Sequence, residues 1–248
     1  MIVLRAPAKL TRYLEITGRR ANGYHELRSE MTSLALADEL TVDESGDYVR
    51  VRNHFERPVP EGGENLVARA LALVERRAGV VIDKLIPAGG GLGGGSADAA
   101  AILRWAGGVD PLDAVRLGGD VPFCQVGGRA LVEGVGERVS PLAFDDRPVT
   151  LFIPDFGIST RDCYEAYDEL YDAGWRPSGS NHLEEPACAV EPRLALVLVQ
   201  LRERFGDVRV AGSGSTMFVE GVISDFGDVT GPAMRLRVVS TTTTPAGA

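Results

Sequence analysis

The sequence predicts a soluble globular protein of mixed α and β structure that divides into two domains. Of its 248 residues, 44% are hydrophobic and 25% are charged, which is ordinary for a globular chain and enough for a core without metal or disulfide. Alternating or β-branched runs, typical of strands, are interspersed with helical patterns. The polar stretch 145–148 separates two apolar regions. We therefore expect domains at 1–146 and 147–240, followed by a disordered Thr-, Pro- and Gly-rich tail at 241–248.

The first domain begins with strands and reaches a helix only after residue 60. The patterns predict strands over 2–16, with a break at Pro7, over parts of 27–42, and at 49–52. A turn at 62–65 opens a helix over 66–75, which we expect to end by Gly79. A strand at 80–86 follows and is ended by Pro87.

A glycine-rich loop then leads into the next predicted helix. Ser96 is expected to be the N-cap of a helix that starts over 97–103. A short helical stretch at 113–117 and a turn at 118–123 follow. Beyond the boundary, the patterns predict strands at 149–153, 208–211 and 216–220, and helices at 160–170 and 192–204.

Charge and cysteine content exclude several classes of function. The net charge of −9 argues against binding to nucleic acid or to anionic lipid. The longest apolar run, 194–199, is far shorter than the roughly 20 residues needed to cross a bilayer, and the apolar start of the chain is too short for a signal peptide. The three cysteines show no C-x-x-C spacing, which fits a reducing compartment. We expect a cytoplasmic protein with a small-molecule partner and no nucleic-acid or membrane partner, as a monomer or a homodimer.

The seven residues from Gly89 to Gly95 include six glycines directly before a helix start. Glycine loses conformational entropy on folding, so such a run indicates that something approaches the backbone closely. Free amides at a helix N-terminus bind anions, and a nucleotide phosphate is the expected one. A flexible surface loop is the alternative. Gly89, Gly91 and Gly94 match the spacing of the dinucleotide-binding fingerprint, but a single match inside a glycine run is weak evidence. A P-loop is excluded because Ser96 is not preceded by lysine.

Lysine is scarce in this chain. Of 26 basic residues only Lys9 and Lys84 are lysine. Lysine carries a compact charge where arginine carries a wide fork, so these two positions are candidates for places where the fork would not fit.

The glycine segment resembles the phosphate loop of the GHMP small-molecule kinases. The resemblance rests on a run of consecutive residues: Pro87, Ala88, Gly89, Gly90, Gly91, Leu92, Gly93, Gly94, Gly95, Ser96 and Ala97. Further matches appear in the family's order at 6–10, 18–27, 64–66, 117–123, 181–184 and 212–215. Thr11 stands where the family usually has asparagine, and Ala97 replaces the second serine of the loop. The chain is also short for the family, with a trimmed second domain.

The resemblance implies a two-domain α+β GHMP kinase fold. Its N-terminal domain would resemble domain 2 of ribosomal protein S5, and its C-terminal domain would be a ferredoxin-like α/β-plait. It also implies transfer of the γ-phosphate of ATP, with Mg²⁺, to the 2-hydroxyl of a cytidine diphosphate methylerythritol in nonmevalonate isoprenoid synthesis. The alternatives are another GHMP kinase acting on mevalonate, homoserine or a sugar, a dinucleotide-dependent oxidoreductase, and a nucleotide-binding relative without turnover.

The resemblance gives the catalytic and ATP-binding residues specific roles. Asp120 would orient the hydroxyl and accept its proton late in phosphoryl transfer, and Lys9 would hold Asp120 ionised and neutralise charge on the transferred group. Their alternatives are a helix N-cap and a surface lysine. Lys84 would follow a phosphate or ribose oxygen as a mobile ammonium. Asn65 would contact adenine or cap a helix, and Ser96 could touch phosphate or Mg²⁺. The role of Asp98, in the same helical turn, is left open between facing away and meeting the metal.

The remaining candidates concern the acceptor. Tyr24 and His25 would read cytosine by stacking and hydrogen bonding, although packing in a turn is the alternative. Tyr164 would stack on the base or pack in the core. Gly212 and Ser213 would form an amide nest or a β-turn. Thr11 would keep a shortened substrate contact, if any. His54 and His182 lack metal-ligand spacing and are interpreted as structural or surface residues.

Overall fold

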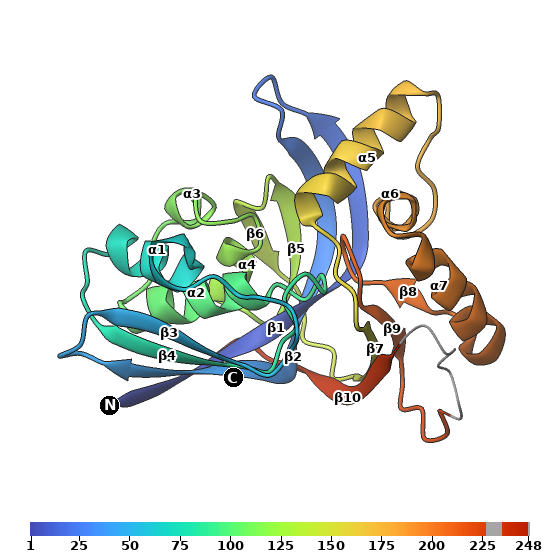
Figure 1. Ribbon diagram of the computed structural model, residues 1–248. Helices are drawn as coiled ribbons and strands as arrows, with labels where there is room; N and C mark the ends of the chain where they lie inside the picture. The colour runs from blue at the N-terminus through green and yellow to red at the C-terminus, as the bar shows by residue number, and fades with distance from the viewer. Residues whose placement is uncertain (227–234, 248) are drawn as a thin grey trace.

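The computed structural model describes residues 1–226 and 235–247. Within them, strands and helices build around one mixed sheet (Figure 1). The order of strands along its main path is β3, β4, β2, β10, β7, β9 and β8. Strand β1 pairs with β2, and β5 pairs with β2 and β6. The strands are β1 (Ile2–Arg19), β2 (His25–Asp43), β3 (Tyr48–Asn53), β4 (Gly79–Lys84), β5 (Arg129–Gly134), β6 (Arg138–Pro141), β7 (Pro148–Pro154), β8 (Arg209–Val210), β9 (Met217–Glu220) and β10 (Leu236–Thr244).

A long hairpin of β1 and β2 runs through the molecule. The predicted break at Pro7 is wrong, because β1 continues through it and only the register with β2 shifts between Pro7 and Lys9. A β-bulge interrupts the hydrogen-bond ladder only locally, so the strand can continue on both sides of it. The tip of the hairpin rises beside α5 in Figure 1, so one element contributes to both halves of the molecule.

Helices α1–α4 cover the sheet in the first half (Figure 1). Their bounds are α1 (Leu66–Leu73), α2 (Gly94–Trp105), α3 (Pro111–Ala114) and α4 (Val121–Val126), and a 3-10 turn, η1 (Gly62–Glu64), precedes α1. Small alanines let α2 pack closely, and every residue from Ala97 to Leu103 is buried. The prediction of Ser96 as N-cap is wrong, since α2 already starts after Gly93. The turn predicted over 118–123 is also wrong at its end, where α4 begins.

The second half packs three helices against the other end of the sheet. They are α5 (Thr160–Asp172), α6 (Glu184–Val190) and α7 (Pro192–Phe205). A second apolar cluster, which includes Phe152, Tyr167 and Leu198, forms their core and takes in Leu14 from β1. The hairpin therefore enters both cores, and the division at 146/147 stays a prediction.

The predicted disordered tail is wrong for residues 241–244. They belong to β10, which pairs with β7 along most of its length and with β2 at Thr243 and Thr244. Thr243 also donates its hydroxyl to Asp145 O, which fixes the tail on the chain segment between the halves. The tail thus completes the sheet. Residue 248 lies outside the described residues.

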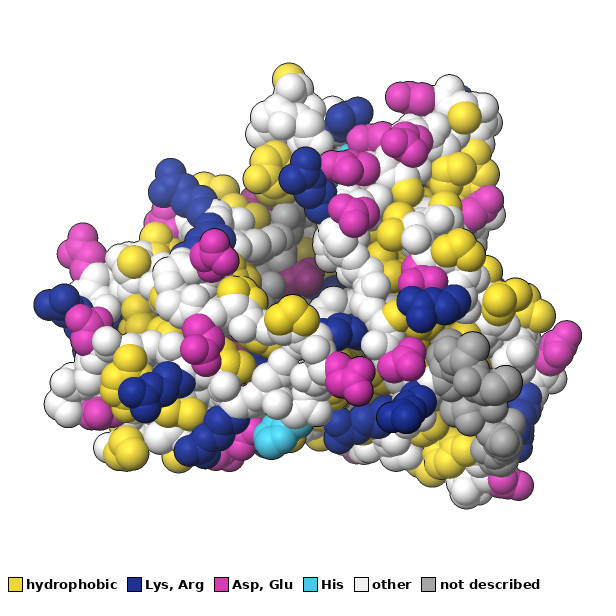
Figure 2. Space-filling model, viewed as in Figure 1, with side chains coloured by type: hydrophobic (Ala, Val, Ile, Leu, Met, Phe, Trp, Pro, Cys, Tyr) yellow, Lys and Arg dark blue, Asp and Glu magenta, His cyan; other side chains and the backbone are white. Residues whose placement is uncertain are grey.

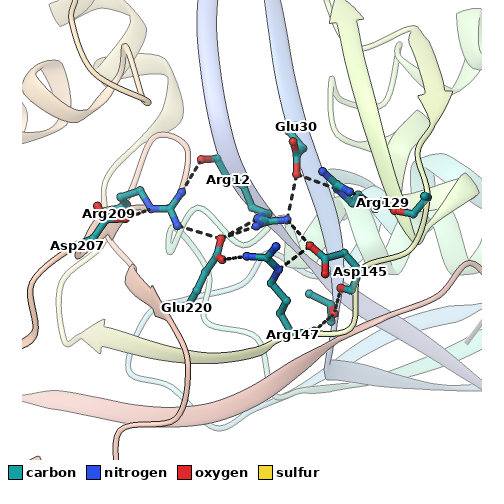
Figure 3. Close-up of polar contacts among 10 residues, drawn as sticks. Arg12, Glu30, Arg129, Asp145, Arg147, Asp207, Arg209 and Glu220 are labelled. Carbon is teal, nitrogen blue, oxygen red and sulfur yellow. Dashed lines mark hydrogen bonds and ion pairs between the residues drawn. The ribbon is translucent and has the colours of Figure 1, made fainter.

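An arginine-rich network further joins the two halves (Figure 3). Arg12 of β1 pairs with Glu30 on β2, with Asp145, and with Glu220 on β9. Arg147 and Arg209 also bind Glu220. Burial would raise the pKa of Glu220, but hydrogen bonds from these three guanidinium groups lower it to about 2. None of the described helices is long and apolar enough to cross a membrane.

Candidate active site

The glycine loop between β4 and α2 is shaped by close packing. Gly91 and Gly93 have φ values of +75° and +66°, which disfavour any side chain. A Cβ at Gly91 would overlap the carbonyl oxygen of Ala211, and one at Gly93 would lie 2.7 Å from Lys9 Cγ. Leu92, between them, is buried in a third apolar cluster. The glycines therefore allow protein groups, as well as any ligand, to approach the backbone.

A first cavity, of about 330 Å³, lies along this loop. The N-terminus of α2 borders it, and the amides of a helix's first turn together with its dipole favour an anion there. Most predicted nucleotide-binding residues line it: Asn65, Lys84, Pro87, Ala88, Gly89, Gly90, Gly91, Gly93, Gly94 and Gly95. The side chains of Leu92 and Ala97 lie in apolar clusters instead. Lys9, Asp98, Asp120, Gly212 and Ser213 are also among the residues that line it.

Lys9 and Asp120 form an ion pair at the end of this cavity. Lys9 Nζ lies 3.2 Å from Asp120 Oδ2 and donates to Thr11 Oγ1 at 2.9 Å. The Lys9 side chain is 6% exposed and the Asp120 side chain 29%. Asp120 occupies the N-cap position of α4 but makes no capping hydrogen bond with its side chain. The carboxylate is thus held by the lysine and stays open to the cavity.

Lys84 is placed quite differently from the prediction. Its ammonium is buried, binds Asp38, and donates to Asp98 Oδ2 at 2.7 Å. Burial lowers the pKa of Lys84, but the two carboxylates outweigh this and raise it. Burial raises the pKa of Asp98 to about 7 against the pull of Lys84. Lys84 is therefore a fixed ammonium rather than a mobile one, and Asp98 turns towards it.

Asn65 is the N-cap of α1. Its side-chain oxygen accepts from Val67 N at 2.9 Å, and its amide donates to Pro60 O at 2.7 Å. The capping alternative is thus confirmed, and a contact with adenine stays a prediction. Ser96, in the first turn of α2, borders the second cavity and not the first.

The second cavity, of about 870 Å³, opens between the hairpin tip, α5 and the loop before α4. Tyr24, His25, Ser96, Asp120 and Tyr164 line it. Asp120 and Tyr164 line the first cavity as well, so the two cavities meet at this carboxylate. Figure 2 shows the hollow between the two halves of the molecule.

His25 is held by residues of α5. Its Nε2 lies 2.7 Å from Asp168 Oδ1, and its ring stacks on Tyr164 with centroids 4.9 Å apart. Burial raises the pKa of the Tyr164 hydroxyl, which stays protonated. Tyr24 is 65% exposed at the hairpin tip. The structure thus brings His25 and Tyr164 together and leaves Tyr24 exposed at the edge of the second cavity.

The segment 212–215 approaches the ammonium of Lys9 at Gly212. A Cβ at Gly212 would be 3.3 Å from Lys9 Nζ, and Asn181 Nδ2 donates to Gly212 O at 2.8 Å. Ser213 Oγ lies 3.0 Å from Thr160 Oγ1. Thr11 is buried with its hydroxyl on the Lys9 ammonium, so it supports the lysine, and its substrate contact stays a prediction.

His54 and His182 bear out their structural interpretation. His54 is exposed and its Nε2 lies next to Asp83 Oδ1, while His182 Nδ1 accepts from Ile16 N at 3.1 Å. Burial lowers the pKa of His182. No group of three or more His, Cys, Asp and Glu within residues 1–226 and 235–247 is arranged to hold a metal ion.

Sequence reasoning missed three residues that shape the site. Asp38 binds Lys84 and two backbone amides before the glycine loop. Asp168 fixes His25. Arg57 donates to the carbonyls of Ala88 and Phe156, which ties the loop to the second half. All three act on partners distant in the sequence, and no local pattern indicated them.

Comparisons with known proteins agree with this geometry. The family model described as the GHMP kinases N terminal domain matches residues 65–128. The 4-diphosphocytidyl-2-C-methyl-D-erythritol kinase of Methylibium petroleiphilum is 35% identical over 240 residues, which is 87% of this chain and 83% of the relative. That of Thermus thermophilus is 36% identical, with 86% of this chain and 85% of the relative covered. The chain belongs to this kinase family.

Solved structures extend the comparison to the whole family fold. A crystal structure of 4-(cytidine 5'-diphospho)-2C-methyl-D-erythritol kinase matches with a TM-score of 0.70 and 31% identity, covering all of both chains. A crystal structure of mevalonate kinase matches with a TM-score of 0.57 at 12% identity and shows the shared fold. The α+β GHMP kinase fold implied by the resemblance is thereby confirmed.

Proposed function

We propose that this protein transfers the γ-phosphate of ATP to the 2-hydroxyl of 4-diphosphocytidyl-2-C-methyl-D-erythritol, in the nonmevalonate synthesis of isoprenoid precursors. One observation carries the proposal. Asp120, paired with Lys9 at 3.2 Å, lines both the cavity along the glycine loop and the cavity that contains His25 and Tyr164. A donor phosphate and an acceptor hydroxyl bound in the two cavities would meet at this carboxylate.

Asp120 and Lys9 suit the chemistry of such a transfer. A carboxylate is too weak a base to ionise an alcohol in advance, so Asp120 orients the hydroxyl and takes its proton as the new P–O bond forms. Lys9 pairs with the carboxylate and offers positive charge to the transferred group. Thr11 holds the ammonium in place.

The nucleotide side is built mostly from backbone. The glycine loop and the N-terminus of α2 offer amides for the phosphates. Asn65 lines the same cavity, and we place the adenine next to it. Mg²⁺ in kinases is held largely by phosphate oxygens and water with few protein ligands, so the lack of an acidic cluster in the described residues does not argue against it. Ser96, which lines the second cavity together with Asp120, is the candidate protein ligand that we keep from the sequence. When bound, the ion neutralises charge on the phosphates.

The acceptor side fits a cytosine base. The hydrogen bond between His25 and Asp168 fixes the imidazole, whose other nitrogen can face the edge of the base. Tyr164 and Tyr24 supply aromatic faces for stacking. Gly212 and Ser213 line the first cavity near Lys9, and we place the polyol of the acceptor next to them. We place the reaction in the cytoplasm, consistent with the free thiols of Cys124, Cys163 and Cys188.

ADP release from ATP and a panel of alcohols tests the assignment. We expect turnover with the cytidine substrate, none with mevalonate, homoserine or galactose, and competition by cytidine monophosphate. Asp120→Asn should lower kcat about 10²–10⁴-fold, the usual contribution of a general base. Asp146→Asn, an exposed acid near the domain boundary, is the matched control and should not change kcat. Equal turnover of Asp120→Asn and wild type would remove Asp120 from its role, and preference for another alcohol would overturn the substrate.

A further inference from the structure

A buried ionic cluster lies beneath the glycine loop. It consists of Lys84 at the end of β4, Asp38 on β2 and Asp98 on α2. The three side chains are 0–3% exposed. They come from the two elements that flank the loop and from the strand that neighbours β4 in the sheet.

Asp38 holds the first end of the loop. Its Oδ1 accepts hydrogen bonds from Leu85 N at 2.5 Å and from Ile86 N at 2.7 Å. These are the two amides directly before Pro87. Its Oδ2 accepts from the Lys84 ammonium. One carboxylate thus fixes the direction in which the chain leaves β4.

Asp98 holds the second end. It lies in the first turns of α2, whose N-cap Gly93 is the last residue of the loop. Its Oδ2 accepts from Lys84 Nζ at 2.7 Å. A Cβ built at Gly94 would lie 3.1 Å from the same Nζ, so the ammonium is packed directly against the start of the helix. Lys84 therefore connects both ends of the loop through its two partners.

Stability does not explain this arrangement. Two carboxylates share one ammonium away from water, and Asp98 Oδ1 has no hydrogen-bond partner among the described residues. Buried ion pairs rarely stabilise a fold more than well-packed apolar groups would, because each charge loses its hydration. What the cluster supplies is a fixed geometry for the two ends of the loop, while Leu92 packs its middle into an apolar cluster.

We propose that Lys84, Asp38 and Asp98 are positioning residues that hold the two ends of the glycine loop, so that its amides are arranged for a nucleotide phosphate before ATP binds. Lys84 then acts on ATP through the backbone, without touching a phosphate. The inference rests on the proposed ATP site in the first cavity. A positioning role of Lys84 and a direct contact of Lys84 with a phosphate predict different effects of removing the charge of Asp98.

The kinetic test compares Asp98→Asn and Lys84→Met with wild type. If the cluster positions the loop, Asp98→Asn raises KM for ATP about 3–10-fold and Lys84→Met about 10–100-fold, while KM for the alcohol changes less than about 2-fold. If Lys84 instead reaches a phosphate, Asp98→Asn frees its ammonium and lowers KM for ATP or leaves it unchanged, which would overturn the proposal. Asp83→Asn, the neighbouring partially exposed acid on β4, is the matched control.

Amide hydrogen exchange of the free protein tests the same point without turnover. In the absence of nucleotide, exchange in the segment 85–95 should be at least about 5-fold faster in Asp98→Asn than in wild type or Asp83→Asn, with unchanged exchange in α5. Equal exchange in all three proteins would overturn the proposal even if Lys84→Met failed to fold. A wild-type protein that does not use ATP would refute the proposed function, whereas the exchange experiment would still decide whether the cluster holds the loop.

Discussion

The two lysines of this chain make the same kind of ion pair in opposite surroundings. Lys9 faces Asp120, whose side chain is 29% exposed at the junction of two cavities. Lys84 faces Asp38 and Asp98, which are almost wholly buried. Asp120 is open enough to respond to a reacting group, whereas the side chains of Lys84 and Asp98 border the first cavity but are only about 3% exposed, which favours a role in fixing the backbone around them. Access, and not residue type, separates the catalytic lysine from the positioning one.

The arginines of the network in Figure 3 have neither the catalytic role of Lys9 nor the positioning role of Lys84. In the network of Figure 3, Arg12 reaches Glu30, Asp145 and Glu220 with one planar group. The lysines instead have glycines against them: Gly93 lies next to the Lys9 stem, and Gly94 next to the Lys84 ammonium. A wide fork suits diverging partners, and a compact ammonium suits a narrow space. The prediction that the arginine fork would not fit at these two positions agrees with these close glycines, and substitution by arginine tests it.

Removal of Lys9, whose ion pair is open to the cavities, should have the largest effect in this comparison. Lys9→Met should lower kcat about 10²–10³-fold, because positive charge is lost where negative charge is transferred. The melting temperature should fall by less than about 3 °C, since the orphaned Asp120 carboxylate can be hydrated from the cavity. Steady-state ADP release and thermal unfolding measure the two quantities.

The contrast with Lys84 depends on Lys9→Met lowering kcat strongly while changing the melting temperature little. If Lys9→Met instead unfolded the protein while keeping kcat in the folded fraction, Lys9 would be a structural residue like Lys84. Arg5→Met, on the same strand with its side chain hydrogen-bonded to Ala35 O, is a suitable control and should keep wild-type kcat.

Replacement of the buried Lys84 by arginine should have the second-largest effect. Lys84→Arg keeps the charge but needs room that Gly94 and the two carboxylates do not leave. Overpacking in a core costs typically 1–3 kcal/mol, and we expect about 2–3 kcal/mol here, or a fall of about 5–10 °C in melting temperature. Differential scanning calorimetry would show it. An unchanged melting temperature would mean that space does not dictate lysine at this position.

The sequence revealed the parts of the site whose signals are local. The glycine loop, the helix after it and the order of the family motifs were all visible in short windows. The pairing of Lys9 with Asp120 came from the resemblance, because a pairing across 111 residues leaves no local trace. Asp38 was missed for the same reason, since its lysine partner lies 46 residues away.

Errors at the element ends have separate physical causes. The prediction of a disordered tail overlooked the threonines of β10, although β-branched residues favour strands when a neighbouring strand is available. Ser96 has the chemistry of an N-cap, but positive φ at Gly93 let the helix start earlier. The mobile-ammonium interpretation of Lys84 was wrong because burial depends on Asp38, which only the tertiary fold supplies.

The arginine network should give the smallest effect and a defined pH dependence. Because its pKa is lowered to about 2, below the ordinary value for glutamate, Glu220 binds fewer protons in the folded than in the unfolded state near pH 3–4. Its contribution is fully present above about pH 4.5 and is lost as the pH falls towards 2. Glu220→Gln should lower the melting temperature at pH 7 by only about 2–4 °C, because the side chain is partly exposed and solvent screens its ion pairs to about 1 kcal/mol.

The difference between Glu220→Gln and wild type, measured by thermal unfolding from pH 7 to pH 2.5, should shrink as the pH falls below 4.5. Glu203→Gln, an exposed acid on α7, should show no such trend and removes the general effect of acid on the fold. A difference that stayed constant down to pH 2.5 would mean that Glu220 acts by packing alone. The network would then resemble neither lysine site, since its charges would affect neither catalysis nor the pH dependence of stability.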